Sequence, residues 1–136
     1  MPIYQNSEQL IQTMRTLFTR MARENPDISK EVSSARLIIR FQVTQPGGTL
    51  TLNGRHNPVQ VSYEPSPLKP DIQVDLSGDA LHHILLGDLA LRAALGNGQM
   101  KVKGAILKSF VLADVFHQCQ AIYPQVAADA GLITNP

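Results

Sequence analysis

Short segments with apolar residues at every second position recur through the middle of the chain. The first covers residues 37–44, where Leu37, Ile39, Phe41 and Val43 share this period. Four later segments repeat it, carried by Leu50 and Leu52, by Val59, Val61 and Tyr63, by Ile72, Val74 and Leu76, and by Met100 and Val102. Because successive side chains of a strand point to opposite faces, this period predicts five strands, each with one buried face.

Apolar residues at steps of three and four predict helices on either side of the strands. Asn6 is a capping residue with Gln9 in the capping-box position, and the apolar stripe that follows contains Leu10, Ile11, Met14, Leu17, Phe18 and Met21. Asn25-Pro26 predicts the start of a short second helix that reaches about Val32.

Three further helices are expected in the second half of the chain. Ser77 or Asp79 can cap a helix that ends at Gly87, and a shorter helix over residues 89–95 ends before Gly98. The last helix carries apolar residues from 106 to 122. Proline lacks a backbone donor, so Pro124 is expected to interrupt this helix and leave a short helical tail to residue 130.

Turn residues predict how the strands connect. Asn53-Gly54 favours a tight reversal because both residues tolerate positive φ, and Pro65, Pro67 and Pro70 mark a loop before the fourth strand. The first four strands are therefore expected to form an antiparallel meander whose apolar face helices must cover. The expected fold is α/β of the α+β type: a five-stranded, mainly antiparallel sheet covered by helices, in a single domain over residues 1–136.

Amino-acid composition limits the possible functions of the chain more than it limits the possible folds. The chain of 136 residues is 43% hydrophobic, and its net charge of +1 offers no basic surface for nucleic acid. Cys119 is the only cysteine, which excludes an internal disulfide and leaves the redox compartment open, with a reducing cytosol as the default. No apolar run approaches the roughly 20 residues needed to cross a bilayer, and the first residues lack the pattern of a secretory signal. The expected location is the cytoplasm.

The order of elements from about Leu37 to Phe116 resembles the sterol carrier protein (sterol-binding) domain family. The resemblance is carried by the strand 71–76, the helix 79–86 with its stop at Gly87, the glycine–strand–glycine unit 98–104 and the helix start 105–112. Members of this family are small domains in which helices cover a five-stranded sheet, and an apolar tunnel between the layers takes sterols, fatty acyl chains or other lipids. The resemblance implies that architecture and an apolar tunnel here.

Apolar spacing and the resemblance together predict the walls of that tunnel. A lipid site needs concave apolar area and few polar groups. The predicted wall residues are Leu85, Leu89, Leu91, Leu95, Met100, Val102, Phe110, Val115, Phe116 and Cys119. The alternative is that all of them are plain core, because apolar stripes at helical spacing usually are.

The expected function is non-enzymatic binding, and with it transfer, of a hydrophobic ligand such as a sterol, a fatty acid, a fatty acyl chain or another lipid. No cofactor, metal or nucleic acid is expected to take part. One alternative is an accessory module that presents an apolar substrate, such as a quinone precursor, to a partner enzyme. The others are a homodimer joined through an apolar face and an enzyme, for which Cys119 and His117 would be the candidate residues.

Histidine and cysteine give only weak signals of chemistry. His82 and His83 are adjacent, and adjacent helical positions point about 100° apart, so they do not easily share a metal ion. Both are expected to be solvated or to lie at the rim of the fold. Cys119 is expected to be a buried, inert thiol.

Lysines alternate with the apolar residues of the fifth strand. Lys101 and Lys103 should lie on the face opposite Met100 and Val102. Together with Lys108 they suggest transient contact with lipid headgroups or an anionic membrane surface. The alternative is a solvated strand edge that discourages pairing with other chains.

Overall fold

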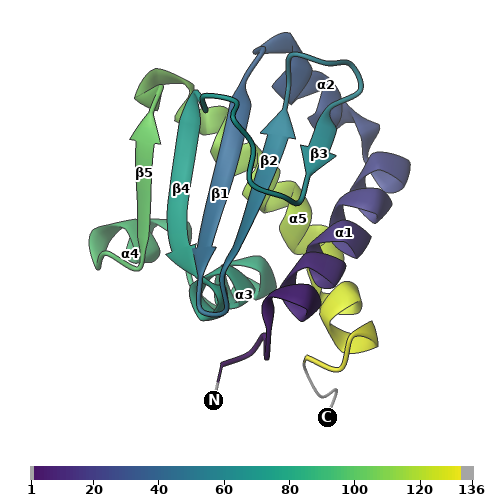
Figure 1. Cartoon of the computed structure of the whole chain (residues 1–136), viewed down its shortest axis with the longest axis vertical. Coiled ribbons are helices and arrows are strands. Elements are labelled where there is room, and N and C mark those ends of the chain that lie inside the picture. The colour runs from purple at the N-terminus through teal and green to yellow at the C-terminus, as the bar shows by residue number, and fades with distance from the viewer. Residues whose placement is uncertain (1, 133–136) are drawn as a thin grey trace.

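The computed structural model describes residues 2–132, which form one sheet with helices on one of its faces (Figure 1). The strands are β1 (Ile38–Thr44), β2 (Gly48–Asn53), β3 (Gln60–Ser62), β4 (Ile72–Ser77) and β5 (Met100–Gly104), in the order β3-β2-β1-β4-β5. The helices are α1 (Ser7–Glu24), α2 (Pro26–Ser34), α3 (Gly78–Leu86), α4 (Leu91–Gly96) and α5 (Ser109–Asp129), with a 3-10 turn η1 (Ile106–Lys108) before α5. The predicted fold class, a mainly antiparallel five-stranded sheet covered by helices, is confirmed.

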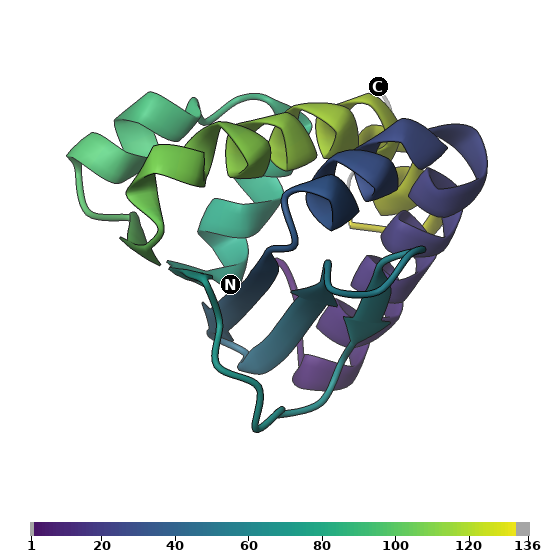
Figure 2. The same ribbon diagram turned by 90° about the horizontal axis from the view of Figure 1, so that it is seen from above.

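The fourth strand departs from the predicted meander, because β4 pairs with β1 in parallel. The antiparallel steps from β1 to β2 and from β2 to β3 leave β3 running in the direction of β1. The proline-rich segment 63–71 then returns across the outer face of the sheet to the end where β1 begins (Figure 2). Arg40 holds this segment in place, since its guanidinium donates to the carbonyl of Ser66 at 3.1 Å and to that of Leu68.

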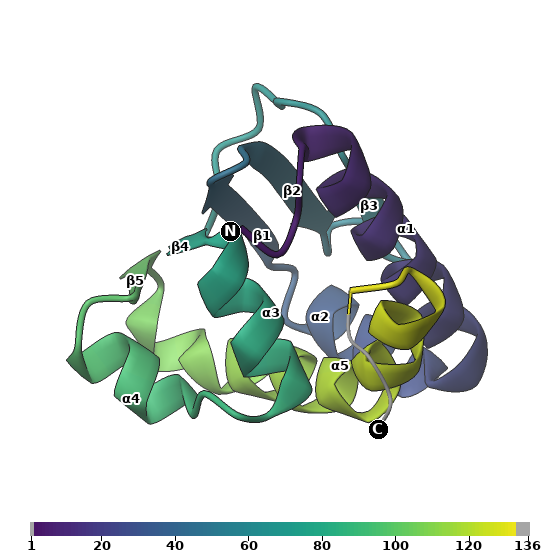
Figure 3. The same ribbon diagram turned by 90° about the horizontal axis from the view of Figure 1, so that it is seen from below.

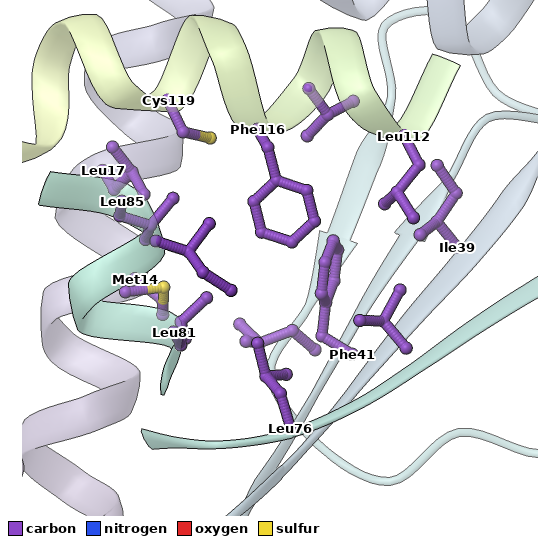
Figure 4. Packing of buried hydrophobic residues seen from close by; sticks show 14 of the residues in the cluster. Met14, Leu17, Ile39, Phe41, Leu76, Leu81, Leu85, Leu112, Phe116 and Cys119 are labelled. Carbon is purple, nitrogen blue, oxygen red and sulfur yellow. The ribbon is translucent and has the colours of Figure 1, made fainter. Parts of the chain in front are cut away.

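The inner face of the sheet and the helices enclose the apolar core. Figures 2 and 3 show α5 and α3 lying on this face, with α1 beside the β2–β3 end of the sheet. The sheet contributes Ile39, Phe41, Val43, Leu50, Leu52, Ile72, Val74 and Leu76, all of them buried. Phe116 of α5 meets Phe41 of β1 edge to face, with ring centroids 5.7 Å apart (Figure 4). This contact joins the helical layer to the centre of the sheet.

Local capping signals act as the sequence predicts. The Asn6 side chain accepts a hydrogen bond from the backbone N–H of Gln9 at 2.8 Å, and the Ser77 hydroxyl accepts one from that of Ala80 at 3.1 Å. Gly87 ends α3 with a φ of 87°, in the left-handed region where a glycine avoids a steric penalty. Ser77 and Gly87 thus set the two ends of α3, which lies beside α5 on the inner face of the sheet (Figure 3).

Two other local predictions are wrong. No tight reversal occurs at Gly54, since residues 54–59 separate β2 from β3. A glycine is required there because a Cβ would lie 2.4 Å from the backbone oxygen of Leu37. Pro124 does not interrupt the last helix, which continues to residue 129. Tyr123 and Val126 beside it are fully buried, and their packing outweighs the roughly 3 kcal/mol that an internal proline costs a helix.

Candidate functional site

An apolar groove of about 470 Å³ opens beside the edge strand β5, between α4 and α5. We call it the β5 groove. Its walls are Leu91, Arg92 and Leu95 of α4, Met100 and Val102 of β5, and Ser109, Leu112, Ala113 and Phe116 of α5. Only Arg92 and Ser109 bring polar side chains. The volume lies within the roughly 300–1,000 Å³ that small-molecule sites occupy.

Two smaller hollows lie beyond the groove beneath α5. The central void, of about 20 Å³, lies between the sheet, α1, α3 and α5; its walls include Phe18, Phe41, Leu81, Leu85, Val115, Phe116 and Cys119. The α2 pocket, of about 60 Å³, lies between α1, α2 and the β2–β3 end of the sheet; its walls include Phe18, Met21, Ile28, Val32, Val61 and Val115.

Three side chains separate these hollows. Phe116 belongs to the walls of both the β5 groove and the central void. Phe18 and Val115 belong to the walls of both the central void and the α2 pocket. The three hollows therefore form a row beneath α5, in the order β5 groove, central void and α2 pocket.

Helical spacing explains how α5 closes this row. Ser109, Leu112, Ala113 and Phe116 stand at steps of three and four, so they share one face of the helix. Figure 4 shows the ring of Phe116 pointing from α5 toward Phe41, with Leu112 and Cys119 on the same side of the helix. The ring stands as a partition between the groove and the void.

Cavity energetics explain why the interior hollows are small. An empty cavity costs about 24 cal/mol per Å³, so an open tunnel of about 300 Å³ would cost about 7 kcal/mol, comparable to the stability of a whole domain. On the same scale the central void, at about 20 Å³, costs only about 0.5 kcal/mol. Side chains such as that of Phe116 fill the space between the groove and the central void.

The predicted wall residues divide among three places. The β5 groove brings together Leu91, Leu95, Met100, Val102 and Phe116. The central void brings together Leu85, Val115, Phe116 and Cys119. Leu89 and Phe110 line neither hollow, and Phe110 is 62% exposed. Sequence reasoning left out Leu112, which stands four residues before Phe116 and so lies on the same helical face.

Cys119 is buried and its chemistry is suppressed. Burial raises the pKa of the thiol to about 12, and the thiol sulfur lies 3.2 Å from the sulfur of Met21. A thiol with that pKa stays protonated at neutral pH, and the thiolate is the form that acts as a nucleophile. The prediction that this thiol is buried is confirmed. His117 is exposed, while Cys119 faces the core.

The prediction of solvated histidines is wrong for His82, which is only 2% exposed. Its Nδ1 lies 2.7 Å from the hydroxyl of Tyr123, which lies 2.5 Å from the hydroxyl of Tyr4. A buried polar group must be hydrogen-bonded, and this chain of contacts meets that need. It joins the segment before α1 to α3 and α5. His83 does lie at the surface, with its Nδ1 3.0 Å from Asp88.

Burial sets the protonation of this buried trio. It lowers the pKa of His82 and raises the pKa of both Tyr4 and Tyr123, because all three lose solvation of their charged forms. With all three groups neutral, both hydrogen bonds are satisfied, because the Tyr123 hydroxyl can donate to one neighbour while it accepts from the other. The trio is a structural brace outside the β5 groove.

The outer face of β5 carries the lysines as predicted. Lys101 and Lys103 are exposed while Met100 is buried, and the Lys103 ammonium lies 3.6 Å from the carboxylate of Asp75. Among residues 2–132, no helix is both long and apolar enough to cross a membrane.

Comparison with solved structures identifies several proteins of similar fold. The sterol carrier protein domain 2 of Helicoverpa armigera aligns with a TM-score of 0.67 and 21% identity, over 83% of this chain and 89% of that one. A UbiJ-SCP2 ubiquinone synthesis protein aligns with a TM-score of 0.58 and 18% identity, over 82% and 89%. A sec-alkylsulfatase from Pseudomonas sp. aligns with a TM-score of 0.53 and 18% identity, over 66% of this chain but 14% of that one.

Sequence comparison is more specific about the family than structural comparison is. No curated protein sequence matches the chain. The family model of the SCP-2 sterol transfer family matches residues 17–117, a stretch that contains the sheet, α2 to α4 and the first part of α5. Since the match covers well over half of the sequence, this chain belongs to the SCP-2 sterol transfer family.

Proposed function

We propose that the chain binds the aliphatic part of a lipid in the β5 groove. The tail enters between α4 and α5 and extends past Phe116 into the central void, which widens as the ring turns aside. The observation that carries this proposal is the row of apolar hollows beneath α5, in a domain of a sterol-transfer family.

The energetics favour reversible binding. Each buried methylene contributes about 0.8 kcal/mol, so a tail that buries ten of them gains about 8 kcal/mol before the costs of association. Such a gain corresponds to micromolar affinity at best, which suits a carrier that must also release its ligand. Arg92 supplies a cation in the groove wall for the carboxylate of a fatty acid. The function needs no chemical step.

A matched pair of variants on α5 tests the proposal. Ala113 and Ala121 are both exposed, but only Ala113 lines the β5 groove. Ala113→Trp places a large ring in the groove without leaving a cavity, and Ala121→Trp adds the same ring elsewhere on the helix. In a titration with a fluorescent fatty acid, we expect Ala113→Trp to weaken binding at least tenfold and Ala121→Trp to leave it unchanged. Wild-type affinity in both variants would exclude the groove as the site.

A second candidate function is that of an accessory domain that holds an apolar substrate for a partner enzyme. It is favoured by two proteins of similar fold. One is a ubiquinone synthesis protein, and the other is a sulfatase in which the matching domain makes up only 14% of the chain. Transfer of a fluorescent lipid between vesicles separates the two roles. A carrier speeds the transfer by itself, whereas an accessory domain binds lipid and leaves the transfer rate unchanged. Native mass spectrometry of the purified protein would identify the class of lipid that it binds. The location of the protein in the cytoplasm stays a prediction.

A further inference from the structure

The turn that leads into α5 exposes two large apolar side chains. Leu107 in η1 is 94% exposed and Phe110, three residues later, is 62% exposed. The turn lies at the end of the sheet where β5 ends and where β1 and β4 begin (Figure 1). Neither side chain lines the β5 groove. Exposed apolar patches are candidate interaction sites on a protein surface.

A polar hollow of about 490 Å³ lies at the same end of the molecule. Arg36, Arg55 and Lys108 contribute three cations to its wall, and Asp71 contributes one carboxylate, which leaves an excess of two positive charges. Asp71 already pairs with Arg55 at 3.4 Å. The Lys108 ammonium lies 3.5 Å from the backbone oxygen of Ala35, so η1 is held against the end of α2. We call this the cationic hollow.

The apolar pair, the cationic hollow and the β5 groove meet in four consecutive residues. Leu107 and Phe110 form the pair, Lys108 lines the cationic hollow and Ser109 lines the β5 groove. These four residues therefore bring the apolar pair, the wall of the cationic hollow and the wall of the groove together at one end of the sheet.

We propose that this tip docks on a bilayer that contains anionic phospholipid. Leu107 and Phe110 enter the apolar boundary of the bilayer, while Arg36, Arg55 and Lys108 bind the negatively charged headgroups. One apolar and one basic signal together give stable but reversible attachment to a membrane surface. Charge favours a bilayer over a second copy of the chain, because two copies docked through this tip would bring like charges together.

Acidic groups on the flank limit the strength of this attachment. Asp114 follows Phe110 by one helical turn and lies beside Glu31 of α2, where it raises the pKa of the Glu31 carboxyl. Both carboxyls oppose an anionic surface when they are charged. These two carboxyls therefore weaken the docking. The passage of a lipid from the bilayer into the groove rests on the proposed function, whereas the docking itself does not.

Co-sedimentation with vesicles tests the docking. Vesicles of phosphatidylcholine alone are compared with vesicles that also contain phosphatidylserine, at low and at high salt. Two double variants remove the two signals: Leu107→Ser with Phe110→Ser, and Arg36→Glu with Lys108→Glu. Leu68→Ser and Arg23→Glu are the matched controls, because both residues are exposed and lie outside the tip and its hollow.

We expect the wild type and both controls to bind phosphatidylserine vesicles and to lose that binding at high salt. The apolar double variant should bind at least tenfold less, since two large side chains no longer enter the bilayer. The basic double variant should also bind at least tenfold less, because each lost cation accounts for about a fivefold change near an anionic surface. Both variants should bind a fluorescent fatty acid in solution as the wild type does, so this assay reports on the groove separately.

Equal vesicle binding by the wild type and both double variants would overturn the proposal. So would a wild type that does not bind phosphatidylserine vesicles while its fatty acid affinity is intact. A dimeric wild type that the apolar double variant converts to a monomer, as measured by light scattering, would assign the tip to a second copy instead.

Discussion

Replacement of Phe116 by alanine should open the row of hollows from within. Phe116 is 2% exposed, packs edge to face on Phe41 at 5.7 Å, and separates the β5 groove from the central void. Removal of a buried phenyl ring costs about 3–5 kcal/mol of folding free energy, part of it for the cavity left behind. A ligand tail that refills the space with three methylenes regains about 2.4 kcal/mol, a gain of about fiftyfold in affinity.

Calorimetric titration with saturated fatty acids of increasing length measures this gain, and chemical denaturation measures the loss of stability. The variant should bind long chains more tightly than the wild type does, whereas short chains that end within the groove should bind equally to both. Ile84→Ala is the control: Ile84 is buried in α3 outside the walls of all three hollows. It should lose stability without any change in ligand affinity. If Phe116→Ala is destabilised but binds every chain length as the wild type does, the hollows are not one site.

Three further predictions concern the brace and the sheet. Burial lowers the pKa of His82 below its ordinary 6.5, so the unfolded state binds more protons in mild acid. The free energy of unfolding should therefore fall as pH drops from about 6.5 toward the lower folded pKa; in urea titrations across this range His82→Gln should lose that contribution, and a pH dependence identical to that of the wild type would exclude it. Tyr123→Phe leaves Tyr4 and His82 without their shared hydroxyl and should lower the free energy of unfolding by about 1–3 kcal/mol. Chemical denaturation measures this loss, and an unchanged free energy of unfolding would contradict the structural role of the hydroxyl. Gly54→Ala would place a Cβ 2.4 Å from the backbone oxygen of Leu37 and should cost about 1–3 kcal/mol or more; an unchanged denaturation midpoint would show that the backbone there can yield.

Elements with strong local signals were predictable from the sequence. Asn6 caps α1 and Gly87 ends α3 because these interactions lie within one helical turn. Strand β1 was predictable because its pattern of apolar residues at every second position extends over seven residues. The effect of Pro124 was predicted wrongly, because the local cost of a proline is offset by the burial of its neighbours against distant elements.

The candidate site was predictable only in part. Period identifies the face of α5 that is buried, and this places Phe116 and, by the same spacing, Leu112 in the groove wall. The same rule would have excluded Phe110, which stands six positions before Phe116 and so on another face of the helix. No spacing rule would have excluded Leu89, because this residue lies in the connection between α3 and α4.

By itself the sequence determined which segments are helices or strands and which of their faces are apolar, since these properties depend on neighbours a few residues apart. Only the tertiary structure decided which faces meet. The return of segment 63–71 across the sheet makes β4 parallel to β1, and His82 finds Tyr123 from 41 positions away along the chain. The same holds for the β5 groove, whose walls come from three separate elements. A periodic apolar pattern predicts that a side chain is buried. Contacts between distant residues decide which partner it packs against and whether a gap remains between them.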